Sequence, residues 1–470
     1  MISANEINFL IHRHLQETGF PHTAYVFSNE ACIEQANFPV DQLPPHAFVT
    51  ILKNGMLYLQ LEKAINEKAK EGCSSDDIVL SLINAVKNEE PIIPHKNQQK
   101  QKIPNPIIPK PLPFIVNPTI IDDEDVLFLR GHFDEVYCGA WSNDGKLFAS
   151  GSKDATAIIW EINNHEYVTH YTLDHATQEN RKNLDITALS WNPSGTILAT
   201  GCMDGIARLW SSKGELKFVL NCHSDSIYAL QFSPDGASLL TCGGDNRIIY
   251  WDVATGEMKQ IYSYHSNRIM DVDWYDNKTF ASCASDSLIA ISNIDETQPR
   301  YILRGHTSEV NKIEWDPTKK MLASCSDDHT IRIWKPFENP YAIVLTGHTE
   351  DVYTIKWAPG DSHIIASGSF DFTVRLWNVA TESCIAVFDT FVKPVYSVWF
   401  SPLGKFLVAG GVDGNAMIWR VSDFAHIATY SAESCIYEAK WDNTGENIAL
   451  CLSNSMISII STEKLPYYQE

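Results

Sequence analysis

Residues 324–334 read SCSDDHTIRIW, and His306 lies eighteen residues before Ser324 in the segment RGHTSEV. A serine, a histidine and an aspartate are the residue types of a nucleophilic triad, in which the histidine activates the serine and the aspartate orients the histidine. An active site of this kind is built once in a chain. The first question is therefore whether the same spacing occurs elsewhere.

The spacing recurs throughout the C-terminal part of the chain. Asp328 follows Ser324 by four residues and precedes Trp334 by six, and the same offsets hold in four other sets: Ser150, Asp154 and Trp160; Thr200, Asp204 and Trp210; Thr241, Asp245 and Trp251; Ser367, Asp371 and Trp377. Three incomplete copies are anchored at Asp286, Asp413 and Asn454. Successive anchors are 41 to 50 residues apart. A period of this length, with a Gly-His pair and a late tryptophan, is typical of four-stranded propeller blades.

The histidines complete the pattern, since His306 and His348 precede their aspartates by 22 and 23 residues. The repeats resemble the WD-repeat family over residues 122–470. In that family histidine, serine or threonine, aspartate and tryptophan form a structural hydrogen-bonded tetrad. The resemblance implies this role for His306, Ser324, Asp328 and Trp334, and for His348, Ser367, Asp371 and Trp377. A buried carboxylate needs such donors. We therefore expect no catalytic residue, no cofactor site, no metal ligand and no enzymatic activity.

The composition excludes several classes of protein. The net charge is −22, and residues 1–121 hold 10 Lys/Arg against 12 Asp/Glu, so almost all of the excess belongs to residues 122–470. An acidic propeller is poorly suited to nucleic acid or an anionic membrane, but could attract basic peptides. Eleven cysteines show no metal-binding spacing. There is no run of 18 apolar residues and no signal-peptide pattern in MISANEINFL.

The N-terminal part carries helix signals and ends in a proline-rich segment. Ser3 and Glu6 form a capping box, and apolar residues then recur at helical spacing until Gly19. The segment from Ile7 to Ala31 resembles the LisH motif. Two short helices cannot bury a wide apolar face alone, so we expect homo-oligomerisation, although the pair could instead dock on its own chain. The oligomerisation residues would be Ile7, Leu10, Ile11, Leu15, Phe20 and Phe27.

The order of segments resembles the transducin β-like family of corepressor subunits, in which an F-box-like segment follows the LisH motif. We therefore expect a LisH dimerisation motif at 1–34, an F-box-like helical segment at 35–90, a Pro-rich linker at 91–121 and an eight-bladed WD-repeat β-propeller at 122–470. The fold class is all-β with a small all-α N-terminal domain. DVLFLR, residues 125–130, would supply the outer strand of the eighth blade and close the ring.

One face of the ring is a candidate peptide site. In WD-repeat proteins the narrower face is a common docking surface, lined by fixed positions after the Gly-His histidine and by the residue before the blade aspartate. The fifth position after the histidine, aligned in blades two, seven and eight by the preceding apolar residue (Ile186, Val395, Ile436), holds five tyrosines in eight blades. The expected binding residues are Tyr137, Tyr228, Met270, Tyr353, Tyr396 and Tyr437, with Lys153, Phe370, Glu135, Arg268, Glu309 and Asp351 around them. Tyrosines suit binding surfaces, but these residues could instead simply pack the channel mouth.

Three function classes follow from these resemblances. The first is a non-enzymatic scaffold in a nuclear histone-deacetylase corepressor complex, which binds corepressor proteins, the deacetylase or histone tails. The second is a substrate adaptor for ubiquitin ligase and proteasome machinery. The third is a cytoskeletal regulator, as in other LisH-plus-propeller proteins, but residues 62–90 lack the sustained heptad pattern that this class would need. Nuclear localisation is implied by the family resemblance alone.

Overall fold

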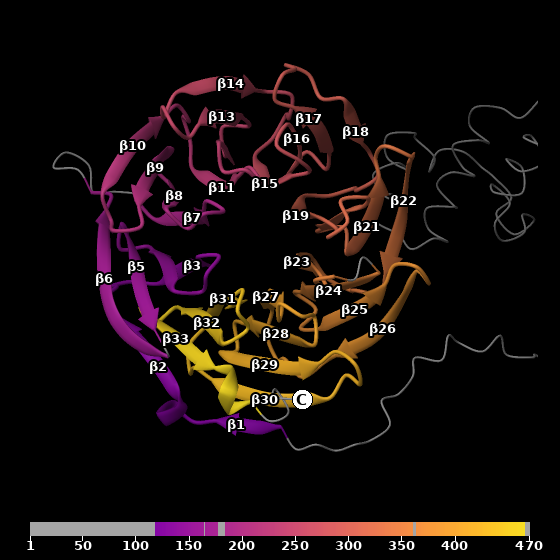
Figure 1. Cartoon of the computed structure of the whole chain (residues 1–470). Helices are drawn as coiled ribbons and strands as arrows, with labels where there is room; N and C mark the ends of the chain where they lie inside the picture. The colour runs from indigo at the N-terminus through magenta and orange to yellow at the C-terminus, as the bar shows by residue number, and fades with distance from the viewer. Residues whose placement is uncertain (1–117, 164, 177–183, 361–362, 466–470) are drawn as a thin grey trace, which may run out of the picture. The chain divides into compact units, whose positions relative to one another are not determined.

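The computed structural model describes residues 118–163, 165–176, 184–360 and 363–465, all of which belong to the second of two compact units, residues 103–470. The LisH motif, the F-box-like segment and the linker up to residue 117 lie outside the described residues. The described part folds into eight β-sheets arranged as a closed ring around a central opening (Figure 1). It contains no helix that could cross a membrane.

Each blade is an antiparallel sheet whose first strand faces the centre. The first strands are β3 (Val136–Trp141), β7 (Ile186–Trp191), β11 (Ile227–Phe232), β15 (Ile269–Trp274), β19 (Val310–Trp315), β23 (Val352–Trp357), β27 (Val395–Phe400) and β31 (Ile436–Trp441). The second strands are β4 (Leu147–Ser152), β8 (Ile197–Cys202), β12 (Ser238–Gly243), β16 (Thr279–Ala284), β20 (Leu322–Ser326), β24 (Ile364–Ser369), β28 (Phe406–Gly411) and β32 (Asn447–Leu452).

The two remaining strands of each blade lie towards the rim. The third strands are β5 (Thr156–Asn163), β9 (Ile206–Ser211), β13 (Ile248–Asp252), β17 (Ile289–Asn293), β21 (Thr330–Lys335), β25 (Val374–Asn378), β29 (Asn415–Arg420) and β33 (Met456–Ser461). The outer strands are β6 (Glu166–Asp174), β10 (Leu216–Asn221), β14 (Met258–Tyr262), β18 (Tyr301–Leu303), β22 (Asn339–Thr346), β26 (Ser383–Phe388), β30 (His426–Ser431) and β2 (Val126–Arg130).

The hydrophobic core lies between neighbouring blades. Val352 and Ile355 of β23, for example, pack against Ile331 and Ile333 of β21 in the preceding blade. The second strands are buried on both faces and consist almost wholly of apolar and small residues, whereas outer strands such as β10 are mostly exposed. Because each blade buries its faces against two neighbours, the ring depends on closure between its ends.

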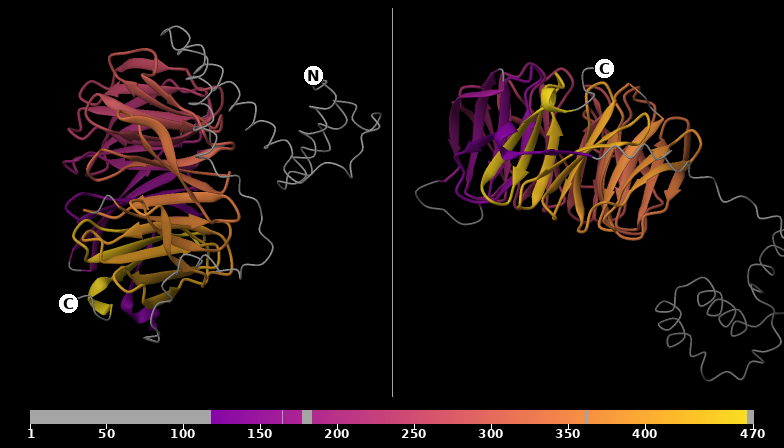
Figure 2. Two further views of the ribbon diagram at one scale, coloured as in Figure 1. Left: turned by 90° about the vertical axis from the view of Figure 1, so that its right-hand side faces the viewer. Right: turned by 90° about the horizontal axis from the view of Figure 1, so that it is seen from below.

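The two ends of the ring meet in the eighth blade, which confirms the expectation from DVLFLR. β2 pairs antiparallel with β33 from Val126 opposite Ile460 to Arg130 opposite Met456, and the indigo and yellow strands lie side by side in Figure 1. His165, from the β5–β6 turn of the first blade, reinforces the joint because its Nδ1 lies 2.7 Å from Asn447 Oδ1. Seen from the side, β1 and β2 run along the rim (Figure 2).

The structure adds a strand that was not expected. β1 (Thr119–Ile121) pairs in parallel with β30 and makes the seventh blade five-stranded. These residues belong to the segment that the sequence assigns to the linker. A short 3-10 helix, η3 (Asp123–Asp125), then leads into β2, and a second, η4 (Thr462–Lys464), follows β33.

Candidate functional site

The histidine, serine and aspartate of the fifth blade form a closed hydrogen-bond network. His306 Nδ1 lies 2.8 Å from Asp328 Oδ2, and His306 Nε2 lies 2.7 Å from Ser324 Oγ. Trp334 Nε1 donates to the same serine oxygen at 2.9 Å. Ser324 has no exposed surface, so its hydroxyl cannot reach a substrate. In the sixth blade His348, Ser367, Asp371 and Trp377 repeat these contacts at 2.7 to 2.8 Å.

Two blades build the network from other residues. In the second blade His175 Nδ1 donates to Leu173 O at 2.9 Å, and Asp204 pairs with Arg208 at 3.1 Å. Burial and the nearby Arg208 lower the pKa of His175 to about 4, so its imidazole is neutral. In the fourth blade, where Ser292 replaces the tryptophan, Ser292 Oγ donates to Tyr264 Oη at 2.7 Å, and Tyr264 Oη lies 3.4 Å from Ser282 Oγ.

Every first strand has a β-bulge at its second residue. The pairing with the second strand shifts there in all eight blades, for instance between Val136 and Cys138 in β3 and between Val352 and Thr354 in β23. The unpaired residue is the fifth after the histidine position. A bulge turns such a side chain away from the ladder. The eight bulged residues therefore form one ring, the mouth ring: Tyr137, Thr187, Tyr228, Met270, Asn311, Tyr353, Tyr396 and Tyr437.

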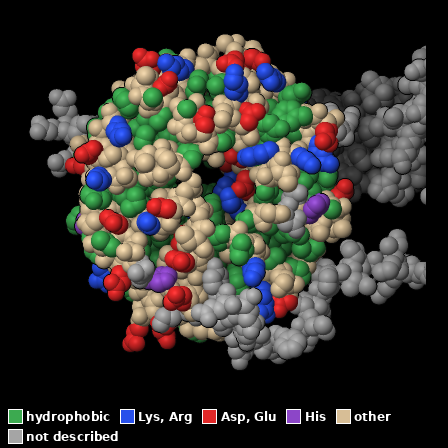
Figure 3. All heavy atoms as spheres, viewed as in Figure 1, with side chains coloured by type: hydrophobic (Ala, Val, Ile, Leu, Met, Phe, Trp, Pro, Cys, Tyr) green, Lys and Arg blue, Asp and Glu red, His purple; other side chains and the backbone are tan. Residues whose placement is uncertain are grey.

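Two further rings of side chains line the channel below the mouth ring. The residues directly after the bulge form the second ring: Cys138, Ala188, Ala229, Asp271, Lys312, Thr354, Ser397 and Glu438. Two residues further on is the third ring: Ala140, Ser190, Gln231, Asp273, Glu314, Lys356, Trp399 and Lys440. The first cavity, about 440 Å³, contains the mouth and second rings, and the next, about 520 Å³, contains the third. Figure 3 shows the ring from the face opposite the mouth, hollowed at its centre with charged side chains inside the opening.

The aromatic residues of the mouth ring form a continuous arc over four neighbouring blades. Tyr353 stacks on Phe370 with ring centroids 5.7 Å apart and contacts Tyr396 at 5.4 Å. Tyr396 stacks on Tyr437 at 6.1 Å, and Tyr437 meets Tyr137 edge-on at 5.2 Å. A third cavity, about 410 Å³, opens directly onto these rings. The opposite side of the mouth, from Thr187 to Asn311, lacks such ring-to-ring contacts.

Charged side chains surround the mouth. Tyr437 Oη donates to Glu135 Oε2 at 2.8 Å, and Lys153 Nζ lies 3.6 Å from Glu135 Oε1. Burial, together with the charge of Glu135, raises the pKa of Tyr137 to about 12, so its hydroxyl stays protonated. Arg268 approaches Glu309 at 3.5 Å. Asp351 lies 3.9 Å from His329 Nδ1.

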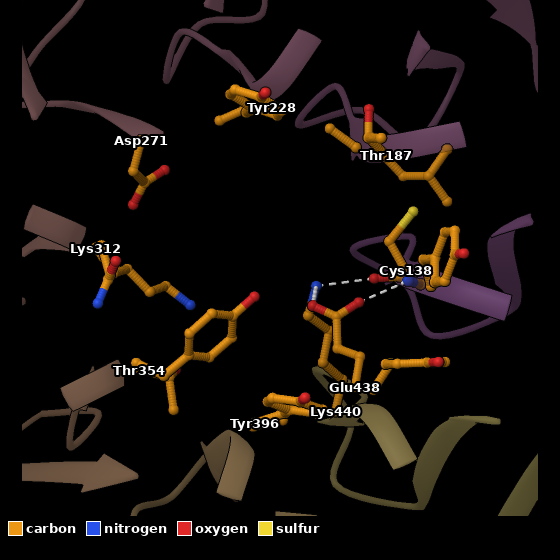
Figure 4. Close-up of a pocket in the computed structure, with 18 of the residues that line it drawn as sticks. Cys138, Thr187, Tyr228, Asp271, Lys312, Thr354, Tyr396, Glu438 and Lys440 are labelled. Atoms are coloured by element: carbon orange, nitrogen blue, oxygen red, sulfur yellow. Dashed lines mark hydrogen bonds and ion pairs between the residues drawn. The ribbon is translucent and has the colours of Figure 1, made fainter. Parts of the chain in front are cut away.

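Charges in the channel gather on the wall formed by the fourth, fifth, sixth and eighth blades. Glu438 accepts a hydrogen bond from the Gly139 amide at 2.6 Å and pairs with Lys440 at 2.5 Å, which joins the eighth blade to the first (Figure 4). Burial raises the pKa of Asp271 to about 7, even though Lys312 nearby lowers it and the Ile313 amide donates to the carboxylate at 3.2 Å. The first three blades contribute only uncharged side chains to the second and third rings.

The structure separates the expected site residues into two groups. The six mouth residues and Phe370 line the cavities of the mouth. Lys153, Glu135, Arg268, Glu309 and Asp351 line none of them; the first four form ion pairs around the mouth, and Asp351 lies beside His329. The second and third rings were missed. Counted from the histidine, simple strand alternation places the fifth and seventh residues on the same face of the first strand. The sequence carries no signal for the bulge, which turns the sixth and eighth residues towards the channel as the second and third rings.

The fold and the repeats define a propeller protein of the WD-repeat class with a non-catalytic scaffold fold. The WD domain, G-beta repeat family matches residues 124–161, 173–211, 214–252, 297–335, 340–378 and 382–420, and the LisH family matches residues 5–31. F-box-like/WD repeat-containing protein TBL1X of Homo sapiens is 34% identical over 377 residues, covering 68% of this chain and 65% of that protein. Its counterpart in Mus musculus is 34% identical, covering 68% and 71%. The chain belongs to the transducin β-like family.

The lengths and the solved structures add two facts. The chain covers slightly less than two thirds of the human relative's own length. Among solved structures, the C-terminal WD40 domain of Sif2 superposes with a TM-score of 0.64 at 24% identity, covering 71% of this chain and 98% of that domain. This likeness shows the fold alone. The family matches leave out the three inner strands of the fourth and eighth blades, and the structure supplies both blades as complete four-stranded sheets.

Proposed function

We propose that this protein is a non-enzymatic scaffold subunit of a nuclear histone-deacetylase corepressor complex and that the mouth of its propeller binds peptide segments of other subunits or of histone tails. The observation that carries the proposal is the mouth ring, where a backbone bulge in every blade presents a side chain to one opening and four aromatic rings touch in sequence. Tyrosine offers apolar area and a hydroxyl at low entropic cost, as protein interfaces require.

The charge of the propeller supports a basic partner. Residues 122–470 carry 26 Lys/Arg against 46 Asp/Glu, and Glu135, Glu309 and Asp351 lie around the mouth. Complementary charge speeds encounter with a basic segment and selects against acidic ones. The LisH match at residues 5–31 supports oligomerisation, which would present several mouths in one assembly.

Affinity purification of the tagged full chain, followed by mass spectrometry, tests the proposal. Recovery of a deacetylase together with a corepressor protein supports it. The second candidate function is that of a substrate adaptor for a ubiquitin ligase, because the name of the relatives contains "F-box-like". Recovery of cullin-type ligase subunits without a deacetylase would establish that second candidate and reject the first.

Replacing Tyr353 and Tyr396 by alanine tests the mouth itself. Both rings contribute to the arc, and Tyr353 is 44% exposed, so we expect partner recovery to fall about tenfold while the melting temperature changes by only a few degrees. Tyr275→Ala, at a ring cluster that does not line the mouth, is the control for a general loss of aromatic packing. A large loss of stability in the double variant, with partner recovery proportional to folded protein, would show that these tyrosines only pack the mouth.

A further inference from the structure

The turn between the second and third strands has one backbone feature in common in all eight blades. The residue after the blade aspartate, or after Asn454, adopts a left-handed conformation with φ between 62° and 80°. The eight residues are Ala155, Gly205, Asn246, Ser287, His329, Phe372, Gly414 and Ser455. Seven of them are glycine, small, or polar. Phe372 alone is a bulky apolar residue, for which this conformation is a genuine outlier.

Phe372 is unfavourable in a second way, because its side chain is 42% exposed. The turn gains no core packing from it that would offset the strained backbone. The same turn is held rigidly, since Asp371 accepts hydrogen bonds from the Thr373 amide at 2.9 Å and the Thr373 hydroxyl at 2.7 Å. An outlier retained at a rigid, exposed position points to a role outside folding.

A second exposed apolar residue lies on the adjacent loop. In each of six blades the amide of one loop residue donates to the blade aspartate: Phe133, Ser224, Ser266, Thr307, Thr349 and Val392. Between the third and fourth blades, Asn246 of the left-handed position bonds to Ser266 of this loop at 3.4 Å. The same register places Phe372 beside Val392, which is 71% exposed. The two equivalent positions thus hold Asn246 and Ser266 at one seam and the apolar residues Phe372 and Val392 at another.

These residues continue the aromatic arc outward from the mouth. Phe370, two residues before Phe372, contacts Tyr353 and lies 5.9 Å from Tyr396. Tyr353, Phe370 and Tyr396 contact one another, and Phe372 and Val392 are exposed apolar residues at the seam between the sixth and seventh blades; we call these five residues the apolar strip. Glu350 and Asp351, which precede Tyr353 in the chain, add negative charge beside it. Burial raises the pKa of Asp351, and the nearby charge of Asp327 raises it further.

We propose that the apolar strip binds a linear peptide segment of a partner protein, with apolar side chains seated on Phe372 and Val392 and a basic residue facing Glu350 and Asp351. The inference extends the proposed peptide site at the mouth, because the two share Tyr353 and Tyr396. It specifies the path of the peptide, which runs outward from the mouth over the seam between the sixth and seventh blades. It also adds a composition: apolar residues flanked by positive charge, as an exposed apolar patch with an acidic border selects.

Fluorescence anisotropy with the full chain and three nine-residue peptides tests the proposal. One peptide combines two leucines with three lysines, the second has serines for the leucines, and the third has glutamates for the lysines. We expect the first to bind at least tenfold more tightly than the others. Phe372→Ser and Val392→Ser should each weaken its binding about tenfold. The melting temperature of Phe372→Ser should be unchanged or higher, because Ser287 and Ser455 already occupy the same left-handed position.

Phe133→Ser is the matched control, since Phe133 occupies the loop position of Val392 in the first blade and is 91% exposed, but its seam neighbour is Ser455. The Phe133→Ser variant should bind the first peptide like the wild type. If Phe372→Ser, Val392→Ser and Phe133→Ser all weaken binding equally, the apolar strip is not the binding site. Binding that needs Tyr396 but not Phe372 would overturn the strip and leave the mouth site standing; binding that needs neither would overturn both. If Phe372→Ser changes the sedimentation coefficient but not peptide binding, the apolar strip contacts a second copy of this chain and the peptide proposal is rejected.

Discussion

A buried carboxylate and a buried histidine stabilise each other only when both are hydrogen-bonded. Burial alone would raise the pKa of Asp328, but the hydrogen bond and charge of His306 lower it well below its usual value. Burial lowers the pKa of His306, and Asp328 opposes that shift. Removing one partner leaves the other buried without its donor or acceptor, which costs more than the pair contributes. The repeated residues at fixed spacing therefore belong to folding, not catalysis.

Asp328→Ala should lower the free energy of unfolding by about 2–3 kcal/mol, because it removes the acceptor for His306, the Thr307 amide and the Thr330 hydroxyl. Chemical denaturation measures the change. Asp295→Ala is the control, since Asp295 forms a solvent-exposed ion pair with Lys278 and its loss should leave the free energy of unfolding nearly unchanged. Equal stability of the two variants would contradict the structural role of the tetrad.

The second blade makes stability depend on pH in the mildly acidic range. His175 has a folded pKa of about 4, below the unfolded value of about 6.5, so its neutral form contributes stability above pH 6.5 that is lost as the pH falls towards 4. The full effect is about 3 kcal/mol. His175→Gln should lower the melting temperature at pH 7.5 and flatten its decline between pH 7 and pH 5. A decline as steep as in the wild type would assign the acid sensitivity to other groups, such as His306 and His348.

At the scale of the strand, the repeat predicted which residues reach the mouth but not why. The spacing from His348 and the alignment of Val395 placed Tyr353 and Tyr396 at equivalent positions, and both line the opening. The bulge beneath them depends on pairing between strands, which no local pattern in the first strand records. For the same reason Asp271 and Lys440 escaped notice, although both face the channel. β1 was missed because three residues after a proline run give too short a signal.

The fourth blade shows how a missing tryptophan is compensated by a residue from another position. Tyr264 precedes the histidine, and its hydroxyl joins Ser292 to Ser282. Tyr264→Phe should cost about 1–2 kcal/mol, because it leaves Ser292 without its acceptor in a site with no exposed surface. Tyr250→Phe is the control, since its hydroxyl makes one long contact of 3.4 Å with Ser238. Thermal unfolding of both variants should separate them by several degrees.

At the scale of the whole molecule, the ring is held shut by a strand from before the first blade. Val126 and Leu129 of β2 are buried against the eighth blade, and five residue pairs join β2 to β33. The sequence predicted this closure from an isolated strand pattern and a last repeat that ends at its third strand. It could not predict the additional contacts of His165 and Glu438 across the joint, because these link residues about 300 positions apart.

Two truncations separate closure from the preceding segments. Removal of residues 1–122 takes away β1 but keeps β2, and we expect a folded ring with a small loss of stability. Removal of residues 1–130 also deletes β2 with its buried Val126 and Leu129, and should lower the melting temperature by roughly 10 °C or more and promote aggregation through the exposed edge of β33. Gel filtration and thermal unfolding compare the two. Similar behaviour would mean that the eighth blade is stable with three strands.

The pairing of β2 with β33 also fixes when the protein can finish folding during its synthesis. β2 leaves the ribosome before any complete blade, yet its partner strand ends at Ser461, near the last residue of this sequence. The early strand must therefore wait, unpaired, while more than 300 residues are translated. A product of a premature stop codon before Met456 never supplies that partner. Such a fragment displays an open strand edge, which marks it for chaperones and proteases as an unfinished chain.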